Sequence, residues 1–288
     1  MSGVLGDLVV LDLTRFLSGP YCTLLLAGQG AEVIKIDDPD GGDPTADAPP
    51  MKIATAFSDM LAGTYAALAI VGAVHERARS GRGQSVDVSM VDCLFSMMMY
   101  EPLDCYERLG LPVRQGNRIM RFSPFNTYRA TDGWVAIGVA TEPEWARLAA
   151  AMGRDELGAH PDFARVQWRI RNNEQVDRVV GEWVGALTVA GVVRCLDAVD
   201  VACTPVRTPR DALDWPQLRS RGMVGTLRLP DGTPTEALAS GLPMRYSRSS
   251  GEHDRPAPVP GGDTHAVLAR LLGLSEDEVA ALRRDGVV

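Results

Sequence analysis

Near its start the chain has apolar segments of two kinds, short continuous runs and a segment with helical spacing. Leu8–Asp12 and Ala31–Ile36 are short apolar runs, and Tyr21–Gly28, which lies between them, has apolar residues at helical spacing. Short apolar runs of this kind are typical of buried strands. The pattern therefore predicts a β-α-β unit with a right-handed crossover between two parallel strands.

Two long apolar segments follow. The first has helical spacing from Ser58, a good N-cap residue, to Gly81, a good helix terminator, so we expect one long helix. The second predicts a helix over Met90–Leu109, whose run of three methionines we expect to fill the core. Between them, Ser85–Ser89 alternates apolar and polar residues and predicts a short strand.

The pattern changes near Gly116 to shorter elements. A turn at residues 131–133 precedes the apolar strand Trp134–Gly138, and helices are predicted over about 142–152, 174–185 and 187–198. Residues 222–229 start a hairpin, and two helices follow it over 264–272 and 275–285, the last with a capping box of Ser275 and Glu278. We therefore divide the chain into domains at 1–115 and 116–230 and a C-terminal segment at 231–288.

Composition narrows the possible functions. The chain has 288 residues, 45% of them hydrophobic, which is enough for a substantial core, and its net charge is −8. Because no basic face offsets this acidic excess, we expect no nucleic-acid partner. The N-terminus lacks a signal sequence and no later segment has about eighteen uncharged apolar residues, so we expect a cytoplasmic protein with no membrane partner.

Cofactor and metal motifs are missing from the sequence. The β-α-β segment contains no GxGxxG, so we expect no nicotinamide cofactor. Five cysteines without a CxxC pair, and four histidines far apart in sequence, indicate neither a disulfide framework nor a metal site.

Asp59 is the strongest candidate for chemistry. It stands in the first turn of the predicted long helix, where unpaired backbone N–H groups and the positive end of the helix dipole favour an anion. A carboxylate held ionised in this way is poised as a nucleophile. The alternative is an ordinary acidic residue in a first turn, with no chemical role.

The order of motifs resembles that of the family III CoA-transferases, the group that includes formyl-CoA and carnitine CoA-transferases and α-methylacyl-CoA racemases. The resemblance runs over nearly the whole chain and is specific as an ordered set. Its parts are Val10–Arg15 with Ser18–Cys22, Gly30–Ile36, Gly41–Pro44, Asp59–Asp92, Gly116–Arg118, Pro216–Met223 and Leu272–Ser275. It implies an α/β fold with a Rossmann-like parallel-sheet domain, a smaller α+β domain, a C-terminal segment returning to the large domain, and an interlocked homodimer.

The resemblance also implies an activity and site residues. Asp59 would attack an acyl-CoA thioester, forming a mixed anhydride and then an aspartyl-CoA thioester, from which a carboxylic acid takes the CoA. Coenzyme A would be a substrate, with no permanently bound cofactor. Arg15, with Phe16, Ser18 and Gly19, would line the pantetheine or thioester end, and Lys35 would approach the adenosine phosphates.

The chain departs from the family between its first two motifs. Only fourteen residues, Thr45–Ser58, separate Pro44 from Asp59, too few for a further parallel crossover and strand, so the large domain is shortened by an internal deletion. The missing part carries the family's adenine contacts and the second acid/base histidine of the racemases. A polyglycine loop found in some transferases near Gly116 is replaced by Arg118–Phe122.

Three readings therefore remain open from the sequence. The first is a shortened but active CoA-transferase. The second is a racemase-like or otherwise recruited enzyme, which would use Asp59 as base and need an acid such as Tyr65 or Glu101. The third is a non-catalytic member of the family that has lost CoA binding.

Overall fold

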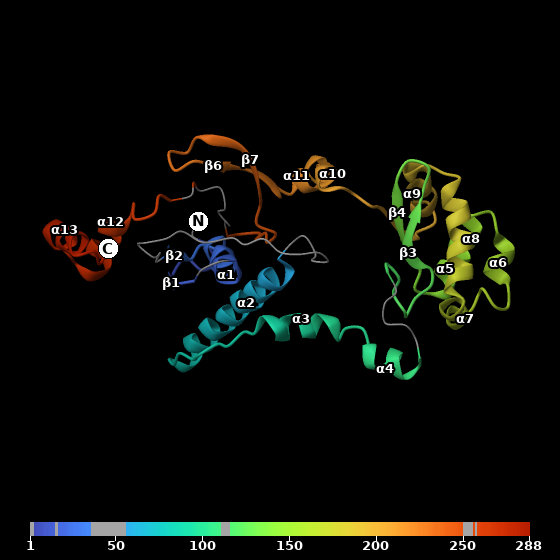
Figure 1. Ribbon diagram of the computed structural model, residues 1–288, viewed down its shortest axis with the longest axis horizontal. Helices are drawn as coiled ribbons and strands as arrows, with labels where there is room; N and C mark the ends of the chain where they lie inside the picture. Colours follow the sequence, from blue (N-terminus) through green and yellow to red (C-terminus); the bar gives the residue numbers. More distant parts are fainter. Residues whose placement is uncertain (1–2, 15–16, 36–55, 111–115, 250–255, 257) are drawn as a thin grey trace. The chain divides into compact units, whose positions relative to one another are not determined.

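Two compact units make up the chain in a computed structural model (Figure 1), which describes residues 3–14, 17–35, 56–110, 116–249, 256 and 258–288. Unit 1 combines Met1–Glu101 with Leu213–Val288, and unit 2 is Pro102–Ala212. The middle unit thus runs from residue 102 to 212, whereas the sequence pattern placed its limits at 116 and 230.

Unit 1 begins with the predicted β-α-β unit, which is confirmed. Strand β1 (Val9–Asp12) pairs in parallel with β2 (Glu32–Lys35), and helix α1 (Ser18–Ala27) connects them. The register sets Asp12 opposite Lys35 at the carboxyl ends of both strands. A small core holds the unit together, formed by Leu5, Leu8, Cys22, Leu25, Leu26, Ala31 and Ala67.

Helix α2 (Phe57–Ser80) packs against α1 and carries Asp59 in its first turn. The prediction that Ser58 caps this helix is wrong: the helix begins one residue earlier, with Ala56 at the cap position, because the Ser58 hydroxyl turns to Asp59 instead of to a backbone N–H. The predicted end is confirmed, since Gly81 has φ +71° and its N–H bonds to the Arg77 carbonyl.

By length and mean hydropathy (1.5), α2 also meets the criteria for a membrane-crossing helix, and 17% of the apolar stretch is buried. In unit 1 it contacts α1 and α3. One helix that meets these criteria is weak evidence for a membrane span.

The single helix predicted over Met90–Leu109 is wrong. It is divided into α3 (Met90–Met98) and α4 (Leu103–Arg108), because Pro102 has no N–H to donate and its ring excludes a continuous helix. The expectation that the methionine run fills the core is also wrong: all three methionines are exposed. Ser85–Ser89 is not a strand, since alternation supplies no partner strand and none of the described strands pairs with it.

Unit 2 is a three-stranded antiparallel sheet covered by helices. The strands β3 (Phe125–Arg129), β4 (Trp134–Gly138) and β5 (Ala202–Pro205) lie in the order β3-β4-β5. The helices are α5 (Glu142–Ala151), α6 (Asp155–Ala159), α7 (Val166–Arg171), α8 (Asn173–Gly185) and α9 (Val189–Asp197). This is the α+β architecture that the sequence predicts for the middle of the chain.

The core of unit 2 is continuous and includes one buried charge. Trp145, Val180 and Leu196 are completely buried in it. The Arg169 guanidinium is also fully buried, donating to the carbonyls of Ser123 (2.8 Å) and Phe163 (2.7 Å), and this burial lowers its pKa to about 10. Its role is structural, because backbone carbonyls take up its donors.

The end of the chain returns to unit 1. After α10 (Pro209–Asp214) and α11 (Pro216–Ser220), strands β6 (Val224–Arg228) and β7 (Pro234–Ser240) form a hairpin, followed by α12 (Thr264–Leu272) and α13 (Glu276–Arg284). The predicted capping box of Ser275 and Glu278 is confirmed. Two contacts tie this part to the β-α-β unit: the Tyr246 hydroxyl donates to Gln29 at 2.7 Å, and Arg270 pairs with Glu32.

Candidate active site

The Asp59 carboxylate accepts hydrogen bonds from two serines. The Ser18 hydroxyl donates to Oδ1 at 3.1 Å from the first residue of α1, and the neighbouring Ser58 hydroxyl donates to Oδ2 at 3.4 Å. The side chain is half-buried. Ser18, which the family resemblance places beside the thioester, therefore contacts the candidate nucleophile itself.

The first turns of two helices meet at this carboxylate. Asp59 belongs to the first turn of α2 and Ser18 to that of α1, so the unpaired N–H groups and the positive dipole ends of both helices face the same region. Such an environment would stabilise negative charge on an oxygen of an attacked carbonyl.

Gly63 permits this close approach of the two helices. A Cβ atom placed on Gly63 would lie 2.5 Å from the Ser18 carbonyl oxygen and 3.1 Å from the Tyr21 ring. Real Cβ atoms do not come so close to a backbone oxygen, so the crossing of α1 over α2 depends on a residue without a side chain. Gly63 follows Asp59 by one helical turn and so fixes the distance between Ser18 and the carboxylate.

Asp12 connects Thr14 and α1 to the end of β1. Its buried carboxylate accepts from the Thr14 N–H (2.9 Å), the Thr14 hydroxyl (2.5 Å) and the Thr23 hydroxyl (2.8 Å). Burial alone would raise the pKa of Asp12, but these hydrogen bonds, with the charge of Lys35, outweigh burial and lower it. A charged Asp12 thus joins β1, the loop and α1.

The other residues expected to bind CoA have structural contacts of their own. The Lys35 ammonium donates to the Thr14 carbonyl and lies 3.7 Å from Asp12 Oδ2, so it is engaged with the same loop. Gly19 packs against Thr14, whose Cβ would lie 2.3 Å from a Cβ at that position. Arg15 and Phe16 lie outside the described residues. A role for these residues in CoA binding stays a prediction.

Tyr65 and Glu101, the acids that a racemase-like reaction would need, form no hydrogen bond with Asp59 among the described residues. The Tyr65 hydroxyl lies 3.5 Å from the Ser96 hydroxyl on α3, and no described contact links Glu101 to the carboxylate. Within the described residues, hydrogen bonds to Asp59 come from Ser18 and Ser58, neither of which is an acid near neutral pH. The geometry therefore offers Asp59 as a nucleophile with hydroxyl neighbours.

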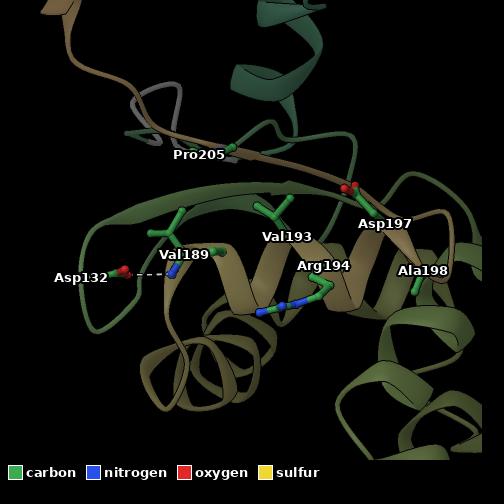
Figure 2. A pocket seen from close by; sticks show the side chains of 8 residues that line it. Asp132, Val189, Val193, Arg194, Asp197, Ala198 and Pro205 are labelled. Atoms are coloured by element: carbon green, nitrogen blue, oxygen red, sulfur yellow. Dashed lines mark hydrogen bonds between the residues drawn. The ribbon is translucent and has the colours of Figure 1, made fainter. Parts of the chain in front are cut away.

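Two hollows in the described part of the chain are lined by unit 2 alone. Figure 2 shows the first, of about 920 Å³, along α9 with Pro205 of β5 at its edge and Asp132 bonded to the Val189 N–H at 2.7 Å. Its lining is mostly apolar, and its charged residues are Asp132, Arg194 and Asp197. The second, of about 810 Å³, lies where α7 turns into α8. Over the described residues, no group of three or more His, Cys, Asp or Glu side chains is placed to hold a metal ion.

Comparison with known sequences identifies a family. The sequence profile of CoA-transferase family III matches residues 5–47 and 44–264. Succinyl-CoA–D-citramalate CoA-transferase of Chloroflexus aurantiacus is 31% identical over 84% of this chain, which spans 60% of that enzyme. Succinyl-CoA:mesaconate CoA-transferase of Haloarcula hispanica is 24% identical, with 90% of this chain and 92% of the relative covered.

The alignment with the Haloarcula hispanica enzyme extends over 377 positions, more than the 288 residues of this chain. That enzyme therefore has residues without a counterpart here. The two pieces of the family match meet at residues 44–47, next to the interval in which the sequence analysis places the shortening.

Solved structures share the fold. A CAIB/BAIF family protein from Brucella suis superimposes with a TM-score of 0.72 and 21% identity, covering 94% of this chain and all of that one. A hypothetical protein from Mycobacterium tuberculosis gives a TM-score of 0.76 at 17% identity, covering 92% of this chain and 99% of the other. At these identities the likeness concerns the fold alone.

Proposed function

The chain belongs to CoA-transferase family III, and from this premise we propose that it transfers coenzyme A from an acyl-CoA to a carboxylic acid, with Asp59 as the nucleophile. The observation that carries the proposal is the position of the Asp59 carboxylate, which accepts from Ser18 where the first turns of α1 and α2 meet. This chain spans 60% of the citramalate transferase. The proposal therefore also states that the residues present in this chain are sufficient for activity.

The proposed reaction proceeds through two kinds of acyl intermediate on Asp59. The carboxylate attacks the thioester carbonyl, the C–S bond breaks, and a mixed anhydride forms as CoA thiolate departs. The thiolate then attacks the aspartyl carbonyl, which releases the donor acid and leaves an aspartyl-CoA thioester. The acceptor carboxylate attacks this thioester to form a second anhydride, and the thiolate takes the acceptor acyl group, restoring Asp59.

The neighbours of Asp59 suit this sequence of steps. Each attack places negative charge on a carbonyl oxygen, and preorganised N–H groups and hydroxyls stabilise such charge without reorganising at the moment of reaction. Ser18 and the first turns of α1 and α2 supply donors of that kind. No proton needs to be moved, which agrees with hydroxyl neighbours in place of a second acid.

We further propose a dicarboxylic substrate. The relatives named above transfer CoA between succinyl-CoA and citramalate or mesaconate, and a further relative in Agrobacterium fabrum is a succinate–glutarate CoA-transferase. Each name pairs succinate with a second dicarboxylic acid. Succinyl-CoA is therefore the donor to test first. Coenzyme A acts in this proposal as a substrate, and the reaction takes place in the cytoplasm.

A homodimer completes the proposal. On α3, Val91, Phe95 and Met98 recur at helical spacing and are 72%, 60% and 57% exposed, and we call them the α3 stripe. Contiguous apolar surface of this kind is characteristic of protein–protein interfaces. A second copy of the chain, presenting the same surface about a twofold axis, would cover it.

Covalent trapping on Asp59 tests the reaction. The full-length protein is mixed with succinyl-CoA and then hydroxylamine, which converts an aspartyl anhydride or thioester into a stable hydroxamate. Peptide mapping by mass spectrometry should find the hydroxamate on Asp59 in the wild type and none in Asp59→Ala.

Asp92→Ala is the matched control, because Asp92 is also a carboxylate in the first turn of a helix, α3, and is exposed. It should form the adduct on Asp59 as the wild type does. Absence of a hydroxamate in the wild type, with succinyl-CoA shown to be intact, would refute Asp59 as the nucleophile toward this donor.

A further inference from the structure

A basic pocket lies on unit 2, in a chain that is acidic as a whole. The hollow of about 810 Å³ where α7 turns into α8 is lined by three arginines, one glutamate and no other charged residue. The three arginines against one glutamate leave the lining with a net charge of +2, whereas the whole chain carries −8. The arginines are Arg118, Arg171 and Arg178, and this hollow is called the basic pocket below.

Two of these arginines have no acidic partner among the described side chains. Arg171 ends α7 and Arg178 lies in the second turn of α8; both are exposed at the pocket, and neither forms an ion pair within the described part of the chain. Arg118 donates through Nε to Asp177 at 2.7 Å, which fixes its guanidinium at the rim. Its terminal nitrogens have no hydrogen bond to any described residue, so they remain available to a ligand.

Amide side chains fill the space between the charges. Gln167, Asn172, Asn173 and Gln175 also line the basic pocket, and each carries two N–H donors as well as an oxygen. Asn172 uses one donor on the Trp168 carbonyl at 2.8 Å, while Asn173 receives a hydrogen bond from Ser123 at 3.1 Å through its oxygen, which leaves its N–H groups free to face outward. Glu174 is the one lining group that would repel an anion.

We propose that the basic pocket binds a small oxyanion with two or more negative charges, carboxylate or phosphate. Guanidinium groups bind both kinds of oxyanion through paired N–H donors, and charge-assisted bonds of this type are about twice as strong as neutral ones. Three guanidinium groups around one hollow can interact with a ligand that carries more than one negative charge. Two sources supply such groups in the proposed reaction, the dicarboxylic acid and the phosphates of coenzyme A, but the binding itself does not depend on that reaction.

Calorimetric titration of the full-length protein tests the proposal with three probes: succinate, inorganic phosphate and adenosine 3′,5′-bisphosphate. At least one should bind with a Kd below about 1 mM, and its affinity should fall as salt is added. Binding of succinate alone assigns the pocket to the acid, and binding of the phosphate probes assigns it to coenzyme A.

Variants locate the binding. The exposed double variant Arg171→Gln/Arg178→Gln should raise the Kd of the bound probe by about tenfold or more, since two charge-assisted contacts are lost. Arg194→Gln is the matched control, because Arg194 is an exposed arginine of unit 2 that lines the other hollow. It should bind like the wild type.

Tryptophan fluorescence melting confirms that unit 2 is folded in each variant, since four of the five tryptophans lie in it. Failure of all three probes to bind below about 1 mM, or equal binding by the double variant, would overturn the proposal. Neither result would affect the Asp59 adduct, so the two proposals fail separately.

Discussion

Units 1 and 2 bury their apolar residues to different extents. In unit 2, the shorter of the two, seventeen described residues form one buried cluster, and ten of them are 0% exposed. In unit 1 the buried cluster around α1 has seven residues, while the α3 stripe is exposed. Unit 2 therefore has the larger core, whereas unit 1 positions the candidate nucleophile on helices that leave apolar surface exposed among the described residues.

The difference in burial separates the part of the chain that contributes most to stability from the part that carries the candidate nucleophile. A small core cannot offset much loss of conformational entropy, so unit 1 depends on close helix contacts and polar networks such as that of Asp12. Changes in unit 2 should act on stability, and changes in unit 1 should act on the geometry around Asp59.

A substitution in the core of unit 2 should lower the free energy of unfolding most. Trp145 is fully buried, donates through Nε1 to the Leu157 carbonyl at 3.0 Å and lies 5.9 Å from the Phe163 ring. Trp145→Ala should cost about 3–5 kcal/mol of unfolding free energy, because it removes a large side chain and leaves a cavity. Urea unfolding followed by the fluorescence of the other tryptophans measures it.

Leu68→Ala provides the comparison in unit 1, where Leu68 is 68% exposed on α2. It should change the free energy of unfolding by less than about 0.5 kcal/mol. A cost close to that of Trp145→Ala would mean that Leu68 is buried in solution, and the contrast between the two units would then fail.

The second effect concerns the helix crossing in unit 1. Gly63→Ala should destabilise unit 1 by about 1–3 kcal/mol, because the new methyl group would meet the Ser18 carbonyl and separate Ser18 from Asp59. Hydrogen exchange of α1 and α2 peptides measures the loss of stability, and the yield of the Asp59 hydroxamate measures the effect of separating Ser18 from Asp59.

Gly72→Ala, on the same helix, is the matched control. A Cβ there meets no atom within 4 Å, so the substitution should stabilise α2 by about 0.5–1 kcal/mol through better helix propensity. If Gly63→Ala lowers the stability and Gly72→Ala raises it, the close contact at the helix crossing, and not the number of glycines, determines the effect of substitution in α2. The same sign for both would refute the close contact.

The sequence predicted the local elements of both units better than the contacts between distant residues. Gly81 and the pair Ser275 and Glu278 end or begin helices as predicted, because those signals act within one turn. The hydrogen bond between Ser18 and Asp59 joins residues 41 positions apart, and no local pattern encodes it. The basic pocket was missed for the same reason, since its arginines come from separate segments.

Two of the wrong predictions share one physical cause. The methionine run of α3 has the composition of a core element, but composition cannot show whether another element covers it, and here the described residues leave it exposed. In the same way, alternation at Ser85–Ser89 cannot supply a partner strand. Only the break at Pro102 carried a local signal that could have divided the predicted helix over Met90–Leu109.

The third prediction tests whether a second copy covers the α3 stripe. Phe95→Asp places a charge at its centre and should raise the dimer dissociation constant by about tenfold or more, since central aromatic residues contribute most to interfaces. Sedimentation velocity measures it. Glu107→Ala, an exposed change on α4 of unit 2, should leave association unchanged. A wild-type protein that is monomeric at all concentrations would contradict the proposed dimer.

The smallest effect is a pH dependence confined to unit 1. The pKa of Asp12 is lowered, because hydrogen bonds from Thr14 and Thr23 and the Lys35 charge outweigh its burial, so the folded state holds its proton less tightly than the unfolded state. Its contribution to stability is thus present above the ordinary carboxyl pKa of 3.8 and is lost as pH falls through the lowered value.

Hydrogen exchange of α1 peptides, corrected for the intrinsic effect of pH, should therefore accelerate on acidification below about pH 4 in the wild type, and much less in Asp12→Asn, which cannot change charge. Asp211→Asn is the control, because the pKa of Asp211 is also lowered, by Thr208, but the residue is exposed and belongs to unit 2. It should leave the acid response of α1 unchanged. If Asp12→Asn kept the full acid response of the wild type, contacts other than those of the Asp12 carboxylate would hold Thr14 and α1 to β1.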